Sequence, residues 1–230
     1  MVLYFMFMLP GILLMLWAQS KVKGSYSKYS KVANSANMTG AQAARRVLDD
    51  NGLHNVQIEQ VRGELSDHYD PRKRVLRLSQ GIYGVPSIAA VAVAAHEAGH
   101  AIQHATGYAP LKTRTAIVPL VSIGSNLGMF VIIGGILLNF TGMAWFGVAL
   151  FGLSTVFALV TLPVEFDASK RAKVALVQAG IVDGGVANGQ ESKGVDAMLD
   201  SAAWTYVAGF AASLLTLLYY VMMVMGMRRD

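Results

Sequence analysis

Four uncharged, apolar runs divide the chain, and each is long enough, or nearly so, to cross a lipid bilayer as a helix. Such a crossing takes about 20 mostly apolar residues. The runs are Val2–Ala18, Ala116–Leu138, Met143–Pro163 and Ala202–Met227. The pattern therefore predicts a mainly α-helical membrane protein with about four transmembrane helices.

The first run, Val2–Ala18, is short enough that a secretory signal peptide must be considered. A signal peptide has a basic region before its apolar residues and a small-residue cleavage site after them. This run has no basic residue before it and no clear cleavage site, and its positive charges begin afterwards with Lys21. We therefore expect a retained membrane anchor.

Between the first two runs, the pattern changes to that of a folded extramembrane domain. "VQIEQV" at Val56–Val61 and "RVLRLS" at Arg74–Ser79 alternate apolar and polar residues, which is typical of half-buried strands. Asp70-Pro71, between them, is a turn signal. These features predict a small antiparallel sheet.

Helical segments flank the predicted strands. "AQAARRVLDD" at Ala41–Asp50 predicts a helix that Thr39 caps and that Asn51-Gly52 ends. A longer helix is expected from about Ser87. The region between the first two runs therefore combines helices with strands.

The positions of lysine and arginine predict which parts face the cytoplasm, because short cytoplasmic flanks are enriched in these residues. They follow the first and third runs and precede the second, whereas the "NFTG" link has no charge. Arg228 and Arg229 are discordant, because this topology puts them outside. The predicted parts are a transmembrane anchor (1–18), a cytoplasmic domain (19–115), a transmembrane hairpin (116–163), a second cytoplasmic segment (164–201) and a transmembrane helix (202–227).

Composition agrees with a membrane protein, since 54% of the residues are hydrophobic and only 14% are charged. The net charge of +5 raises the question of nucleic acid as a partner. Most basic residues lie beside the predicted spans, where topology and anionic lipid headgroups account for them, and we expect no nucleic-acid partner. The absence of cysteine excludes disulfides and thiolate metal ligands.

Candidate chemistry lies in "AAHEAGHAIQH" at residues 94–104, which holds three of the five histidines at steps of four. Residues four apart share a helix face, so His96 and His100 can bind one ion. Zinc binds imidazole nitrogen at about 2.0–2.1 Å and lowers the pKa of a bound water to near 7. Glu97 is then placed to accept a proton from that water. This is the H-E-x-x-H pattern of zinc metallopeptidases.

The alternative is an apolar helix whose histidines are satisfied by hydrogen bonds in a core. The apolar run "SIAAVAVAA" before the motif argues against it, because such a helix would bury ionisable groups without partners. Gly99 also fits a metal site, since a small residue between the ligands lets another segment approach closely. We therefore prefer the metal interpretation.

A catalytic zinc site commonly has three protein ligands and a water position, so one ligand is missing. His104 continues the row, but residues eight apart lie about 12 Å apart along a helix, too far for His96 and His104 to share an ion. Glu165 is the better candidate, because the topology returns it to the side of the membrane that carries the histidines. The alternatives are Asp167 as the ligand, or an ion pair of Glu165 with Lys170 or Arg171.

Three separated stretches together resemble the YugP-like family of neutral zinc metallopeptidases of membranes. They are "DHYDP…LRLS…SIAAVAVAAHEAGHAIQH", "LPVEFDASKRA" and "AAWTYVA", in this order over nearly the whole chain. The resemblance implies a small α+β zincin-like domain around the H-E-x-x-H helix, with one Zn²⁺ per chain. It also implies His96, His100 and Glu165 as ligands and Glu97 as the general base.

A looser similarity connects Glu165–Ser169 with the HtpX-like membrane proteases, which carry Glu-x-x-Ala-Asp after a helical hairpin. Here Ser169 occupies the position of their aspartate. The role of that aspartate does not transfer directly, so Asp167 or a different residue would have to orient a ligand histidine.

Peptide hydrolysis by an activated water also needs a donor that stabilises the oxyanion. His68 and Tyr69 lie near the strands expected to line the cleft, and each is a candidate for this donor or an ordinary residue of the turn at Asp70-Pro71. The sequence does not decide between these roles.

The expected partners are a lipid bilayer and a peptide or membrane-protein substrate. An extended substrate could add by main-chain hydrogen bonds to an exposed edge of the strand before the active helix. We expect an integral protein of a prokaryotic cell membrane, with its active site on the cytoplasmic side.

Glycines in the second run, Gly124 and Gly128, indicate close helix packing, within the subunit by preference or between copies in a homo-oligomer. Two other functions compete with the peptidase. One is a catalytically inert zinc-binding membrane scaffold. The other is a metal transporter, which the lack of ionisable residues inside the four runs disfavours.

Overall fold

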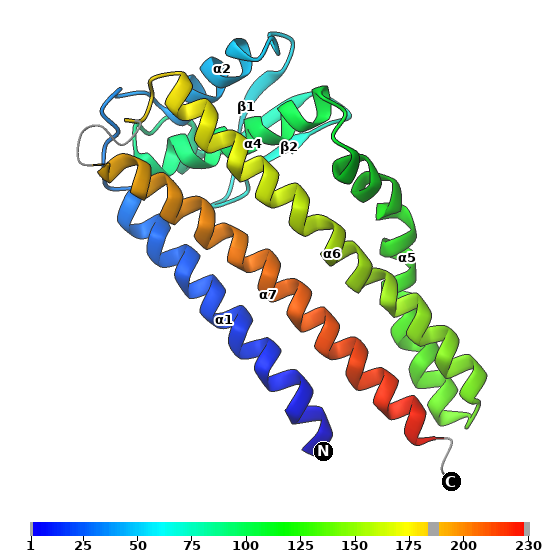
Figure 1. Cartoon of the computed structure of the whole chain (residues 1–230). Coiled ribbons are helices and arrows are strands. Elements are labelled where there is room, and N and C mark those ends of the chain that lie inside the picture. Colours follow the sequence, from blue (N-terminus) through cyan, green and yellow to red (C-terminus); the bar gives the residue numbers. More distant parts are fainter. Residues whose placement is uncertain (1, 184–188, 228–230) are drawn as a thin grey trace. The chain divides into compact units, whose positions relative to one another are not determined.

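A computed structural model describes residues 2–183 and 189–227, and the described chain is mainly helical (Figure 1). By its internal contacts the chain divides into two compact units. The first comprises the residues up to Gln19, Lys112–Pro163 and the residues from Trp204 onwards. The second comprises Ser20–Leu111 and Val164–Ala203. Arg228 and Arg229, the discordant pair of the predicted topology, lie outside the described residues.

Four helices of the described chain are long and apolar enough to cross a membrane. They are α1 (Val2–Tyr29), α5 (Ala109–Leu137), α6 (Thr141–Gln178) and α7 (Gln190–Gly226). Each helix contains one of the predicted apolar runs, although α5 and α7 each end one residue before the run does. The expected number of candidate membrane-spanning helices is therefore confirmed.

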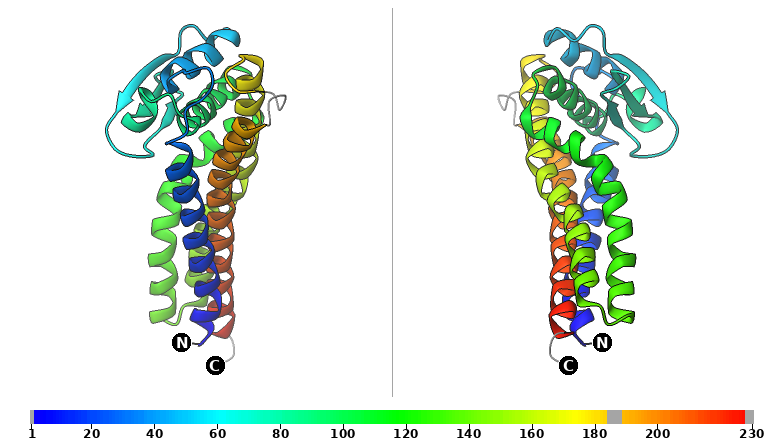
Figure 2. Two further views of the ribbon diagram at one scale, coloured as in Figure 1. Left: turned by 90° about the vertical axis from the view of Figure 1, so that its left-hand side faces the viewer. Right: turned by 90° about the vertical axis from the view of Figure 1, so that its right-hand side faces the viewer.

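In the first unit, segments of these helices run side by side in the order α1, α7, α6 and α5 (Figures 1 and 2). Small residues make these contacts, which lets the helix backbones approach closely. The contacts that define the order are Gly11 with Ala212, Thr155 with Ser213, and Gly135 with Ala144.

The hairpin of α5 and α6 is packed backbone against backbone. A Cβ added to Gly135 would lie 2.4 Å from the amide nitrogen of Ala144, and one added to Gly128 would lie 2.7 Å from that of Phe151. Asn139, in the turn between the helices, has a φ of 51°. Close packing within the subunit, the preferred explanation of the glycines, is therefore confirmed for Gly128.

The second unit contains a three-stranded sheet with the strand order β1-β3-β2. The strands are β1 (Gln57–Val61), β2 (His68–Asp70) and β3 (Val75–Ser79). β1 pairs with β3 in parallel, and β2 pairs with β3 antiparallel. The two predicted strands are confirmed, but the prediction of an antiparallel sheet is wrong because the sheet is mixed. Alternation identifies the two faces of a strand and says nothing about the direction of its neighbour.

Residues 68–70, for which no separate strand was predicted before the turn at Asp70-Pro71, form strand β2. Three residues are too few for alternation to be recognised in the sequence. Because β3 lies between β1 and β2, the expectation that the strand before the active helix has an exposed edge is also wrong. Within the described chain, β1 and β2 are the edges of the sheet.

Local side-chain bonds fix where the helices of this unit begin. The Thr39 hydroxyl accepts from the Gln42 amide while the Gln42 side chain accepts from the Thr39 amide, a capping box. The Ser87 hydroxyl accepts from the amide of Ala90. Both predicted helix starts are confirmed. The helices are α2 (Gly40–Asp50), α3 (Gln80–Tyr83) and α4 (Ile88–Ala105).

Helix α4 lies inside the hydrophobic core of the second unit. Leu76 and Leu78 from β3, Val91 from α4 and Leu176 from α6 are all fully buried in one cluster. This packing surrounds α4 with side chains from the sheet, from α2 and from the last part of α6. The helix that carries the histidines is therefore held on several sides.

Candidate metal centre

Helix α4 and the part of α6 that follows Pro163 approach closely at Gly99. A Cβ added to Gly99 would lie 2.6 Å from the carbonyl oxygen of Ala168, so a larger residue would push the two helices apart. The prediction that Gly99 admits another chain segment is confirmed, and the segment is α6. This contact brings side chains of α6 onto the histidine face of α4.

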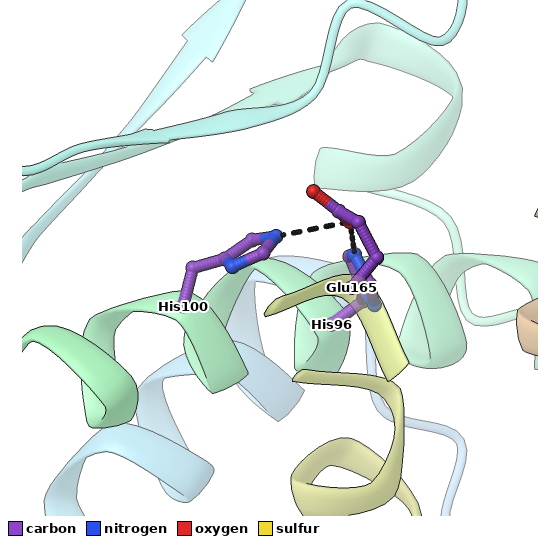
Figure 3. A group of neighbouring side chains, drawn as sticks. All are labelled: His96, His100 and Glu165. Atoms are coloured by element: carbon purple, nitrogen blue, oxygen red, sulfur yellow. Dashed lines mark hydrogen bonds and ion pairs between the residues drawn. The ribbon is translucent and has the colours of Figure 1, made fainter. Parts of the chain in front are cut away.

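Side chains of His96, His100 and Glu165 converge at this crossing (Figure 3). Their candidate ligand atoms all lie within 4.8 Å of one another. The Nε2 atoms of His96 and His100 are 3.2 Å and 3.5 Å from the same oxygen, Oε2 of Glu165. The Glu165 side chain is only 3% exposed and each histidine side chain 12%. Two imidazoles and one carboxylate thus face a common, nearly buried point.

The spacing of these atoms suits a zinc ion. Two ligands of a tetrahedral zinc, each about 2.0–2.1 Å from the metal, are about 3.3 Å apart. The nitrogen–oxygen distances of 3.2 Å and 3.5 Å match this value. Two histidines and one carboxylate are also the ligand set of catalytic zinc sites that keep a fourth position for water. Among the described residues, this is the one group of three or more such side chains with ligand atoms this close.

The second ring nitrogen of each histidine contacts a neutral side chain. Ser169 Oγ lies 3.2 Å from Nδ1 of His96, and Oε1 of Gln103 lies 3.0 Å from Nδ1 of His100. Hydrogen bonds of this kind fix the orientation and tautomer of ligand histidines. They leave both Nε2 atoms directed at Glu165.

Sequence reasoning does not identify these two partners; it leaves the orienting role to Asp167 or a different residue. Oδ2 of Asp167 lies 2.9 Å from Nε2 of Gln103 and 2.5 Å from Nε of Arg171, so Asp167 reaches the site through Gln103. Helical spacing contains the missed signal. Gln103 follows His100 by three residues and Ser169 follows Glu165 by four, and such pairs share a helix face.

The charge around His100 favours a cation. Burial alone would lower the pKa of His100, but the hydrogen bond to Glu165 and the negative charges of Glu97 and Glu165 outweigh burial and raise this pKa above its ordinary value. The same surroundings would stabilise a metal cation in place of the imidazole proton.

Glu97 lies next to the group without belonging to it. Its side chain projects from α4 directly after His96, and the residue is 9% exposed. Its negative charge acts on His100, but Glu97 is not among the three converging side chains. A carboxylate in this place can receive a proton without being a metal ligand.

The remaining candidate residues lie outside the group, on helix α4 and on strand β2. His104 Nδ1 is 3.0 Å from the hydroxyl of Tyr69. Tyr69 is opposite Leu76 in the β2–β3 register and packs against the core. His68 points to the opposite face because successive strand side chains alternate, and its Nε2 is 3.5 Å from Arg77 Nη1. Of the two candidate donors, Tyr69 is the one on the α4 side of the sheet.

Comparison with known proteins agrees with this arrangement. Residues 4–225 match the family described as "Putative neutral zinc metallopeptidase". The chain is 46% identical over 214 residues to the protein described as "Putative membrane protease YugP" of Bacillus subtilis (strain 168), a match that covers 93% of each chain. No solved structure matches the chain significantly.

The resemblance drawn from three short stretches of the sequence is thereby confirmed over almost the whole chain. The family match includes the helix with His96 and His100 and the helix with Glu165. The chain belongs to the family described as "Putative neutral zinc metallopeptidase", with which its sequence motifs agree.

Proposed function

We propose that this protein is a membrane-embedded, zinc-dependent peptidase in which His96, His100 and Glu165 hold one Zn²⁺. The observation that carries the proposal is the convergence of the two Nε2 atoms on one oxygen of Glu165, at distances that suit zinc ligands. The zincin-like character of the second unit and the ligand role of each residue belong to this proposal.

When bound, zinc would polarise the scissile carbonyl and make a bound water acidic. Glu97 is the general base that takes a proton from the attacking water and then delivers it to the leaving amine. The helix that carries it is held in place, since α4 is packed in the core at Ala95 and Ala98. Tyr69 is the preferred oxyanion donor, and Asp167 acts indirectly, through Gln103.

The proposed substrate is a peptide or a segment of a membrane protein, cut near the lipid surface. Strand β2 is an edge of the sheet and is linked to α4 through the contact between Tyr69 and His104. An extended peptide could pair with this edge through main-chain hydrogen bonds. The cytoplasmic orientation of the site, the prokaryotic cell membrane and homo-oligomerisation remain parts of the proposal that rest on the sequence.

Metal content and peptide cleavage measured together test the proposal. In full-length protein purified in detergent, Glu97→Gln should keep about one zinc and lose about 10²–10⁴-fold in cleavage rate. Glu165→Ala should lose zinc and cleavage together, because one of three ligands is removed. Glu59→Gln, at an exposed strand position, is the matched control and should change neither.

The inert scaffold makes the opposite prediction. A protein that keeps zinc only for folding would bind zinc, lose stability when Glu165 is removed, and show no difference between wild type and Glu97→Gln in any assay of peptide cleavage. A membrane-tethered peptide and a soluble peptide of the same sequence should both be tested. Equal cleavage of the two would contradict the proposed membrane-proximal substrate.

A further inference from the structure

Gln103 is a fully buried polar side chain at the crossing of α4 and α6. Its amide makes three contacts. Oε1 lies 3.0 Å from Nδ1 of His100, and Nε2 lies 2.7 Å from the carbonyl oxygen of Val164 and 2.9 Å from Oδ2 of Asp167. A buried amide satisfied on both of its ends costs little, whereas losing one partner would leave a buried polar atom unpaired.

The chemistry of these partners fixes which way the amide points. A backbone carbonyl and a carboxylate can only accept hydrogen bonds, so the NH₂ group must face Val164 and Asp167. The oxygen must then face His100, and Nδ1 of His100 must be the donor. This arrangement assigns a hydrogen to Nδ1 and directs Nε2 toward Glu165.

The same side chain connects the two ligand-bearing helices. It accepts from His100 on α4 and donates to the backbone of Val164, the residue immediately before Glu165 on α6. Asp167 is held in turn by Arg171, whose guanidinium lies over the ring of Tyr108 at 5.7 Å. Gln103 is therefore anchored on the side away from His100.

Ser169, the partner of His96, does not impose the same constraint. A hydroxyl can donate or accept, so its contact with Nδ1 of His96 is compatible with either neutral tautomer. The two imidazoles thus differ: Gln103 dictates the tautomer of His100, and Ser169 adapts to that of His96.

We propose that Gln103 is a positioning residue that holds His100 in the Nδ1–H tautomer, with Nε2 directed at the metal, and that fixes His100 relative to Glu165. This inference rests on the proposed zinc site and not on peptide hydrolysis. It assigns to a residue three positions after the H-E-x-x-H motif a role that neither this pattern nor the family description contains.

The test measures metal binding of the full-length protein in detergent. Zinc affinity is determined by competition with a chelator, and Co²⁺ replaces zinc to give a visible absorption spectrum that reports ligand geometry. Gln103→Met keeps the length of the side chain and removes all three hydrogen bonds. It should weaken zinc binding about 10–100-fold, the usual effect of losing such a partner, and should change the Co²⁺ spectrum.

Gln103→Glu separates the two functions of the amide. The second oxygen of the introduced carboxyl group takes the place of Nε2, 2.9 Å from Oδ2 of Asp167, so the two carboxyl groups would share one proton. The variant then still accepts from Nδ1 of His100 and keeps one donor hydrogen, but it loses one of the two hydrogen bonds that Nε2 donates. This variant should lose less than about tenfold in zinc affinity, so it binds more tightly than Gln103→Met, and it carries the test if Gln103→Met does not fold.

Ser201→Ala is the control for a general loss of stability. Ser201 is also fully buried in the second unit, and its hydroxyl donates to the carbonyl of Met198 at 2.8 Å. Neither residue is among the candidate ligands or their partners Ser169 and Gln103. The control should lower the melting temperature and leave the zinc affinity and the Co²⁺ spectrum unchanged.

Three results would overturn the inference. The first is wild-type affinity and spectrum in Gln103→Met. The second is equal loss of affinity in Gln103→Met and Ser201→Ala, which would mean that stability alone is affected. The third is equally weak binding by Gln103→Met and Gln103→Glu, which would refute the acceptor role. If wild type itself bound no zinc, the proposed function would fail first, so the two failures are distinguishable.

Discussion

The two units of this chain place their large apolar side chains in opposite ways. In the first unit, Ile123 and Phe130 of α5 are 68% and 67% exposed, while glycines such as Gly135 make the contacts between helices. In the second unit, Leu76 and Leu176 are fully buried. Burial of apolar area drives folding in water, whereas helices in lipid associate mainly through close packing of small residues. The difference therefore indicates which solvent each unit is built for.

Close approach at glycine has a different result in each unit. At Gly135 it brings α5 against α6 and yields packing alone. At Gly99 it brings α4 against α6 and also places Glu165 beside two imidazoles. The proposed metal centre thus depends on a contact of the kind that membrane helices use, made inside a unit with a conventional hydrophobic core.

The largest expected effect comes from a comparison in which one large apolar side chain is truncated in each unit. Leu176→Ala removes a fully buried side chain and should reduce the free energy of unfolding by about 2–5 kcal/mol. Phe130→Ala removes a side chain with little packing inside the protein and should change it by about 0.5 kcal/mol or less. Denaturant unfolding of both variants in the same detergent measures the difference. Similar losses in the two variants would contradict the conclusion that exposed apolar side chains of the first unit contribute little to packing inside the protein.

Features that depend on neighbours in the sequence were predictable. Thr39 and Ser87 cap their helices through residues three positions away, and the four long helices follow from the length of apolar runs. The convergence of His96, His100 and Glu165 was also within reach, because the helix spacing and the number of spans between the motifs restrict it. Local pattern was sufficient wherever the structure depends on local contacts.

Apart from the convergence of the three candidate ligands, the features that depend on distant segments were missed. Strand β2 has three residues, and its pairing and the parallel pairing of β1 with β3 are decided across the sheet. Gln103 looks like an ordinary polar helix residue until α6 supplies Val164 and Asp167 as acceptors. The sequence pattern predicts which side of the helix carries Gln103, but it does not predict which atoms of α6 lie against that side.

Adding one methyl group at each glycine contact should have a smaller effect than emptying the core. Gly99→Ala would place its Cβ 2.6 Å from the Ala168 carbonyl oxygen, and Gly135→Ala would place its Cβ 2.4 Å from the Ala144 nitrogen. Each should cost about 1–3 kcal/mol of stability, as overpacking does. Only Gly99→Ala should also weaken zinc binding, because it separates His96 and His100 from Glu165.

Thermal unfolding and chelator competition, run on both glycine variants, test this pair. Gly24→Ala is the control, because a Cβ there would meet nothing within 4 Å. A loss of zinc affinity in Gly135→Ala as large as that in Gly99→Ala would mean that metal binding follows overall stability. The specific function assigned to the Gly99 contact would then be wrong.

The smallest expected effect is on how the stability of the protein changes with pH. Among the described residues, every Asp and Glu lies in the second unit, so carboxylate titration should act there. Burial raises the pKa of Asp67 despite hydrogen bonds from the amide and hydroxyl of Ser79. Hydrogen bonding by the Lys73 amide, with help from Arg77, lowers the pKa of Asp70 although partial burial opposes it. The two carboxyl groups therefore have opposite pH dependences.

For Asp67 the folded pKa lies above the unfolded value, so its contribution to stability is full below the unfolded pKa and is lost as pH rises through the folded pKa. Asp67→Asn keeps an acceptor for the Ser79 amide and removes the charge. Relative to wild type, its free energy of unfolding should increase as pH rises from 3 to 7. The increase should be about 1 kcal/mol or less, since solvent screens a partly exposed group. The free energy of unfolding of Asp70→Asn should decrease relative to wild type over the same range. The reason is that a carboxyl group with a lowered pKa contributes stability that is present above the unfolded pKa, and the variant lacks this contribution. Denaturant unfolding at several pH values gives, for each variant, the difference in free energy of unfolding from wild type as a function of pH. If this difference changed with pH in the same direction for both variants, net charge, rather than the surroundings of each carboxyl group, would govern the acid response of the second unit.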